Sequence, residues 1–104
     1  MWRNQSNNSA SMGVIGWRCD SSTGMLEQWG AGPSMGTDSI QAINFSRPFI
    51  TVYGITISER NSSVDSNRGG SPSVRSITNS GFTATNNDHP IGGTYWVAKG
   101  RGDC

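Results

Sequence analysis

The segment from Glu59 to Pro72 carries the densest set of side chains that could recognise a ligand. It offers guanidinium, amide and carboxylate groups within a long polar break between two apolar stretches. Arginine binds phosphate or carboxylate through paired hydrogen bonds, and loops of this length in a compact domain are usually functional or disordered. We therefore expect a binding loop, with a merely solvated loop as the alternative. Its candidate residues are Arg60, Asn61, Asp65, Asn67 and Arg68.

A second polar loop, Asn86–Gly93, holds the single histidine of the chain. Its candidate binding residues are Asn87, Asp88 and His89. A histidine beside an aspartate could ligate a metal or act as a general base, but one histidine alone in a loop supplies neither a ligand cluster nor a catalytic set. We expect no metal, no cofactor and no enzyme activity, since the chain has seven acidic residues and no evident carboxylate pair for glycoside chemistry.

The composition indicates a small domain with a hydrogen-bonding surface. Of the 104 residues, 33% are hydrophobic and 14% are charged, the net charge is +1, and Ser, Thr and Asn make up about a third. Such a surface suits neutral or mixed ligands, including sugars. It lacks the basic stripe that nucleic acid requires, and no apolar run is long enough to enter a membrane. The small core leaves a monomer marginally stable, so we expect oligomerisation.

Alternating apolar positions and frequent turn residues predict an all-β fold, a small antiparallel β-sandwich of about seven short strands. The longest apolar run, Phe49–Ser58, has two semi-apolar faces and is expected to be a central strand. The expected strands are Gly13–Cys19, Met25–Gly30, Ile40–Phe45, Phe49–Ser58, Val74–Thr78, Phe82–Thr85 and Thr94–Lys99. Residues 1–12 are expected to be a linker, 13–100 the domain and 101–104 a C-terminal tail.

If each strand reverses its predecessor and the chain enters below Gly13, one end of the sandwich gathers two turns, a corner and the tail. That end supplies a second set of candidate binding residues: Asp20, Ser21, Ser22, Arg47, Asn79, Ser80 and Arg101. The same alternation of strand direction brings Cys19 and Cys104 to one end. Two cysteines are too few for a disulfide scaffold, so free thiols are the favoured expectation and a single bond that ties down the C-terminus is the alternative.

The large aromatic residues are expected to be mainly core or subunit-interface residues, with stacking on a sugar as the alternative. They are Trp17, Trp29, Tyr53, Phe82 and Trp96.

Two sequence motifs resemble a known family. Leu26-Glu27-Gln28-Trp29-Gly30, after an apolar strand with Trp17, resembles the opening of the small C-terminal domain of many phage tail fibres, the gp53-like C-terminal domain family. The close is also similar, with Ser80–Thr83 followed by Tyr95-Trp96-Val97-Ala98-Lys99-Gly100. The resemblance covers residues 13–100, and the tail with Cys104 departs from it.

The resemblance implies a homotrimeric tip of a phage or R-type bacteriocin tail fibre, at the distal end of the fibre on the virion. Its partners would be two further copies of the chain and a bacterial surface glycan such as lipopolysaccharide, or an outer-membrane protein. Residues 1–12 would then be the exit from the fibre shaft. The alternative implied role is a trimerisation or folding cap, with recognition elsewhere on the particle.

Overall fold

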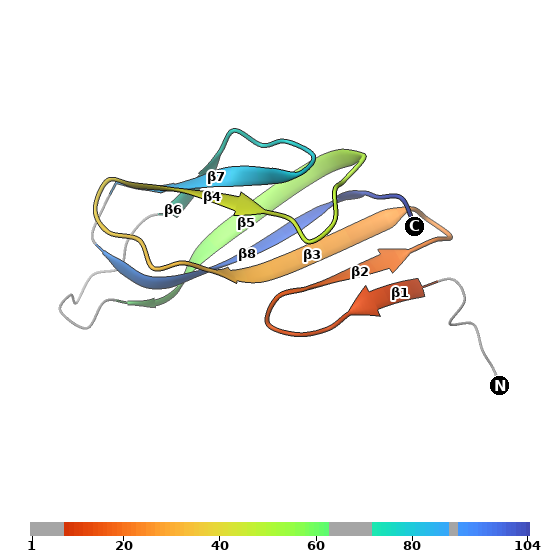
Figure 1. Ribbon diagram of the computed structural model, residues 1–104, viewed down its shortest axis with the longest axis horizontal. Helices are drawn as coiled ribbons and strands as arrows, with labels where there is room; N and C mark the ends of the chain where they lie inside the picture. The colour runs from red at the N-terminus through yellow and green to blue at the C-terminus, as the bar shows by residue number, and fades with distance from the viewer. Residues whose placement is uncertain (1–7, 63–71, 88–89) are drawn as a thin grey trace.

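The computed structural model describes residues 8–62, 72–87 and 90–104, with backbone alone at 8, 9 and 60–62 (Figure 1). Every regular element in these ranges is a strand. The strands are β1 (Asn8–Ser11), β2 (Gly16–Asp20), β3 (Met25–Gly32), β4 (Ser39–Asn44), β5 (Thr51–Ser62), β6 (Pro72–Arg75), β7 (Gly81–Asn86) and β8 (Ile91–Arg101). The described residues contain no helix that could cross a lipid bilayer.

The strands form two antiparallel sheets that enclose one core. The larger sheet has the order β1-β2-β3-β8-β5, and the smaller sheet has the order β4-β7-β6. In Figure 1 β1 lies at one margin of the molecule, and the smaller sheet lies at the other. The all-β antiparallel sandwich predicted from the sequence is therefore confirmed, with one more strand than predicted in the described residues.

The core is an aromatic cluster between the two sheets. The ring of Phe45 lies 4.9 Å from that of Phe49, 5.8 Å from that of Phe82 and 5.6 Å from that of Trp96. All four side chains are buried, and rings packed edge-to-face or tilted at these separations add to the free energy gained from burial. The prediction that Phe82 and Trp96 are core residues is confirmed, and Trp17 packs partly buried against the cluster.

The prediction that Phe49–Ser58 forms a central strand is wrong. β5 is an edge strand of the larger sheet, and the neighbour it pairs with is β8. Its inner face, with Val52, Ile55 and Ile57, packs on the core, but Tyr53 on the outer face is 63% exposed. A long apolar run can thus mark an edge strand when one of its faces is aromatic and polar rather than aliphatic.

The prediction that residues 1–12 are a linker is wrong for β1. Asn8 pairs with Asp20 and Ser11 pairs with Trp17, so these polar residues add an edge strand to β2. An edge strand needs backbone pairing but no buried side chains, and a polar edge strand therefore lacks the alternation by which strands are recognised in a sequence. The extra strand also moves the start of the described chain to the end of the sandwich that holds Asp20.

Candidate functional site

One end of the sandwich, which we call the turn end, gathers four segments that are distant in sequence. They are the turn 20–24, the corner 46–50, the turn 78–81 and the tail 101–104. Backbone hydrogen bonds join them: the Gly102 N–H donates to the Gly24 carbonyl at 2.9 Å, the Ile50 N–H to Arg101 at 2.7 Å, and the Phe49 N–H to Asn79 at 2.8 Å. The structure thus places together the segments that the alternation of strand direction predicts to lie at one end.

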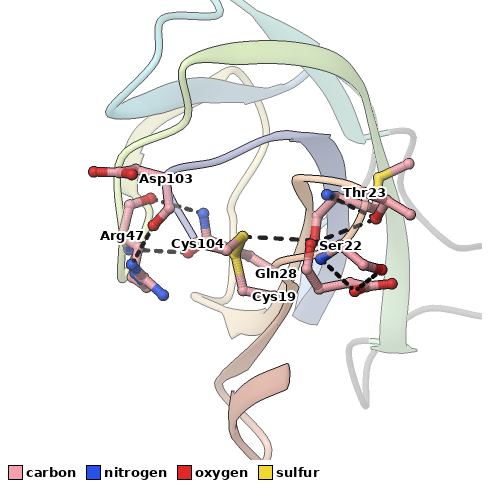
Figure 2. Close-up of a disulfide and its surroundings, with 9 residues drawn as sticks. Cys19, Ser22, Thr23, Gln28, Arg47, Asp103 and Cys104 are labelled. Atoms are coloured by element: carbon pink, nitrogen blue, oxygen red, sulfur yellow. Dashed lines mark hydrogen bonds between the residues drawn. A yellow bond between two sulfur atoms is a disulfide. The ribbon is translucent and has the colours of Figure 1, made fainter. Parts of the chain in front are cut away.

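A disulfide between Cys19 and Cys104 closes the turn end (Figure 2). The two Cα atoms are 5.8 Å apart, and Cys19 is buried in the core. The favoured expectation of free thiols is therefore wrong. The number of cysteines says nothing about their proximity, which follows here from the pairing of β2 with β3 and of β3 with β8.

The corner at Arg47 is held by a buried side chain. The Gln28 amide donates to the Arg47 carbonyl at 2.7 Å and accepts from the Arg47 N–H at 3.0 Å, and Gln28 is 0% exposed. The Arg47 guanidinium lies 4.4 Å from the centroid of the Trp17 ring and donates to the Asp103 carbonyl at 2.9 Å. Figure 2 shows the hydrogen bonds of Arg47 with Gln28 and Asp103 beside the disulfide. Arg47 therefore links the C-terminal tail to the larger sheet, and its guanidinium is occupied by contacts with Trp17 and Asp103.

The other predicted residues of the turn end also have structural partners. Ser22 donates to Asp20 Oδ1 through its N–H at 3.0 Å and its hydroxyl at 2.7 Å, and these bonds lower the pKa of Asp20 below its ordinary value. The Asn79 side chain donates to the Ile50 carbonyl at 3.0 Å, and the Ser80 N–H donates to Thr78 Oγ1 at 3.3 Å. These groups close the turns and the corner of the fold. Ser21 lies exposed in the turn, and the exposed Arg101 side chain lies beside Gly24.

The opposite end, which we call the loop end, carries those members of the first predicted set that the structure describes. The backbone at Arg60 and Asn61 continues β5, and Asn61 pairs with Gly93 of β8. Asn87 is exposed directly after β7. The remaining members of this set lie outside the described residues: Asp65, Asn67, Arg68, Asp88 and His89. The described residues form no cluster of three or more groups suited to a metal ion.

The Gln-Trp-Gly motif of β3 has a structural role at each position. Gln28 holds the Arg47 corner, and the Trp29 indole donates to the Gly13 carbonyl at 2.8 Å while its ring lies over Gly16. Gly30 leaves room for the Trp96 ring, since a Cβ at position 30 would lie 2.8 Å from that ring. Each residue of the motif that carries the resemblance therefore helps to maintain the fold.

The outer face of the larger sheet carries a charged row that the sequence analysis missed. The register aligns Arg18, Glu27 and Lys99 across three strands. Glu27 lies between the two cations, 2.6 Å from Arg18 Nη2 and 3.6 Å from Lys99 Nζ. Two surface hollows meet at this row, one on the β2 side toward Asp20 and one on the β5 side beside Tyr53, and both include Glu27 and Lys99 in their walls. Alternation within each strand indicates that these side chains point outward, but the register between strands was needed to bring them together.

The fold and the motif define a two-sheet domain of the tail fibre type. The profile of the family described as tail fibre protein gp53-like, C-terminal, matches residues 18–101. The chain belongs to this family of tail fibre C-terminal domains.

Solved structures of Pseudomonas aeruginosa pyocin fibres have the same fold. A fragment of the R2 pyocin fibre is 27% identical with a TM-score of 0.75, and the match covers 90% of this chain and 26% of that one. An N-truncated R2-type pyocin tail fibre is 28% identical with a TM-score of 0.76, covering 90% of this chain and 37% of that one. An R1 pyocin fibre, at 19% identity and a TM-score of 0.71, shares the fold over 89% of this chain and 28% of that one. No curated protein sequence matches the chain.

Proposed function

We propose that this domain is the receptor-binding tip of a phage tail fibre or R-type bacteriocin fibre, and that it recognises a bacterial surface glycan such as lipopolysaccharide. Membership of the tail fibre C-terminal family over residues 18–101 carries the proposal. The surface supports it, because a chain with 14% charged residues and a net charge of +1 presents mainly hydroxyl and amide groups to a ligand. On this proposal the domain is a component of a virion or bacteriocin particle and lies at the distal tip of the fibre.

We propose further that the domain works as a homotrimer. Several large apolar side chains are exposed in the single chain, and the densest group lies in the loop between β1 and β2. Met12 is 72% exposed, Val14 59% and Ile15 60%. Contiguous exposed apolar side chains are typical of subunit contacts, and burial between subunits would add the stability that a small core lacks.

The position of β1 reverses the orientation assumed in the sequence analysis. That assumption brought the chain in opposite the turn end, whereas Asn8 pairs with Asp20 at the turn end itself. A fibre shaft that precedes Asn8 would therefore join the domain at the turn end. On this proposal the loop end faces away from the shaft.

The deciding experiment is a binding assay of the fluorescently labelled protein on susceptible cells and on isogenic mutants with truncated lipopolysaccharide. Binding that is lost with the glycan supports the proposal. Binding that survives glycan truncation but is lost after protease treatment of the cells would replace the glycan with an outer-membrane protein. Failure to bind every susceptible strain would contradict a receptor-binding role and favour a folding cap.

The proposal includes binding but no catalytic step. Incubation of the protein with purified lipopolysaccharide, followed by a reducing-sugar assay, checks this part separately. Steady release of reducing ends, dependent on protein concentration, would contradict it.

A further inference from the structure

We infer that the outer face of the larger sheet holds a groove for a saccharide that carries an anionic substituent, an inference that rests on the proposed receptor-binding function. The groove, here called the β5 groove, is a hollow of about 600 Å³ beside the charged row. This volume falls within the range of small-ligand pockets. Its walls are formed by Glu27, Tyr53, Gly54, Thr56, Val97 and Lys99.

Gly54 is the first observation that points to a ligand. It lies inside β5, where glycine weakens a strand, and its φ is not positive. A Cβ added at Gly54 would meet nothing within 4 Å, so neither packing nor backbone geometry requires glycine there. Glycine in a strand often marks a bulge, as beside Gly54, or the close approach of another molecule. The absent side chain keeps the floor of the β5 groove open.

The β-bulge next to Gly54 is the second observation. The pairing of β5 with β8 shifts between Val52 and Gly54, which leaves Tyr53 as the extra residue. Bulges redirect side chains and are frequent beside functional sites. Here the bulge leaves the Tyr53 ring 63% exposed at the wall of the groove, although the inner face of the same strand packs on the core. An exposed ring with a phenolic hydroxyl offers an apolar face to the C–H groups of a sugar and a hydrogen bond to its hydroxyls.

The charges along the groove specify the substituent. Glu27 is flanked by Arg18 and Lys99, and the side chains of the two cations are 64% and 60% exposed while that of Glu27 is 20% exposed. The row as a whole keeps a net positive charge, but of its two cations only Lys99 lines the β5 groove, while Arg18 lines the neighbouring hollow on the β2 side. The exposed Lys99 ammonium therefore offers a point charge to a phosphate or carboxylate on the sugar, and the Thr56 hydroxyl and Glu27 carboxylate remain suited to neutral sugar hydroxyls.

Variants at two positions test the groove without removing core contacts. Gly54→Thr fills the floor with a residue that favours strands, and Ala42→Thr adds the same side chain at an exposed position of the smaller sheet as the matched control. Tyr53→Ser removes the ring, and Tyr53→Phe retains it. The probe is lipopolysaccharide purified from a strain that the wild-type protein decorates, immobilised for interferometry. Light scattering and thermal unfolding are measured for every variant.

We expect Gly54→Thr and Tyr53→Ser to weaken binding by about tenfold or more, while their melting temperature and oligomeric state match those of the wild type. Ala42→Thr and Tyr53→Phe should stay within about threefold of the wild type. Binding to dephosphorylated and to carboxyl-reduced lipopolysaccharide then shows whether the protein recognises the phosphate or the carboxylate. Wild-type affinity in the folded Gly54→Thr protein would overturn the β5 groove and leave the proposed function standing. Absence of wild-type binding to any lipopolysaccharide would overturn both, and a changed oligomeric state in both groove variants would make this face a subunit contact instead.

Discussion

The side-chain amide of Gln28 bonds both the N–H and the carbonyl of Arg47, at 3.0 and 2.7 Å, as the backbone of a paired strand would. This exchange joins β3 of the larger sheet to the corner that leads from β4 into β5. Because Gln28 is fully buried, water cannot replace it. Gln28 therefore fixes the backbone of Arg47, whose guanidinium lies over Trp17, while backbone bonds of Phe49 and Ile50 hold the next residues of the corner.

Gln28→Leu should therefore destabilise the domain strongly. Two backbone polar groups of Arg47 would lose their buried partner, at about 1–3 kcal/mol each. We expect a loss of about 2–5 kcal/mol in urea unfolding. Gln41→Leu, at an exposed position of β4, is the control and should change stability by about 0.5 kcal/mol or less. Equal stability of the two variants would show that the corner is held by other contacts.

The Cys19–Cys104 disulfide should be a major source of stability. It closes a loop with a sequence separation of 85 residues, for which constraint of the unfolded chain predicts about 4–5 kcal/mol. Unfolding of the oxidised protein and of the Cys19→Ser/Cys104→Ser double variant, at one pH, measures this contribution. A difference under about 1 kcal/mol would mean that the hydrogen bonds of Gly102 and Arg47 hold the tail without the bond.

Gly30→Ala should be far more harmful than Gly54→Ala. A Cβ at position 30 lies 2.8 Å from the buried Trp96 ring, whereas at position 54 it meets nothing within 4 Å. Overpacking of this kind costs about 1–3 kcal/mol, while alanine in place of an unstrained strand glycine is neutral or stabilising. Thermal unfolding of both variants checks the order. The reverse order would contradict the packing of Trp96 on β3.

The titration of Asp20 should follow its hydrogen bonds from Ser22. These bonds favour the ionised carboxylate, so its pKa lies below the ordinary 3.8 in the folded protein. A lowered pKa gives a stability contribution that is present above the ordinary value and is lost as the pH falls through the folded value. NMR titration of the Asp20 carboxyl carbon should show the low pKa, and Ser22→Ala should raise it toward 3.8. An unchanged pKa in Ser22→Ala would contradict this account.

The apolar loop between β1 and β2 should decide oligomerisation. Replacing Met12, Val14 and Ile15 with serine removes three exposed apolar side chains, so a subunit contact that buries them should weaken by at least about tenfold. Light scattering over a dilution series measures the change in mass. Ile77→Ser, which removes an isoleucine that is 49% exposed elsewhere, is the control. If the control dissociates the protein as readily, the loop is not the contact.

Much of the fold could be predicted from the sequence because it depends on local signals. The alternation of apolar residues and the positions of turn residues predicted seven of the described strands to within a few residues. The alternation of strand direction predicted which segments meet at the turn end. β1 was missed because a polar edge strand has no apolar period, and β5 was misplaced because an apolar run does not show which strands flank it. The alternation of strand direction brought Cys19 and Cys104 to one end, but it did not show that they are bonded, because that depends on which strands are neighbours.

The candidate site was less predictable, because it depends on register between strands that are distant in sequence. Arg18, Glu27 and Lys99 form a row through two separate pairings. The predicted turn-end residues were polar for a different reason, since Arg47, Asp20 and Asn79 satisfy the backbone and side-chain groups that close the fold. A polar residue in a turn can thus be explained by its structural role in the turn, without a ligand.

The described chain begins at Asn8 and finishes at Cys104 on the same side of the sandwich, and the disulfide fixes the second of these points. Changes at the opposite end of the sandwich, where β5 ends at Ser62 and β8 begins at Ile91, would therefore leave the pairing of β1 and the disulfide untouched. Residues at that end can thus be exchanged by grafting without disturbing the contacts that hold the two ends of the described chain together.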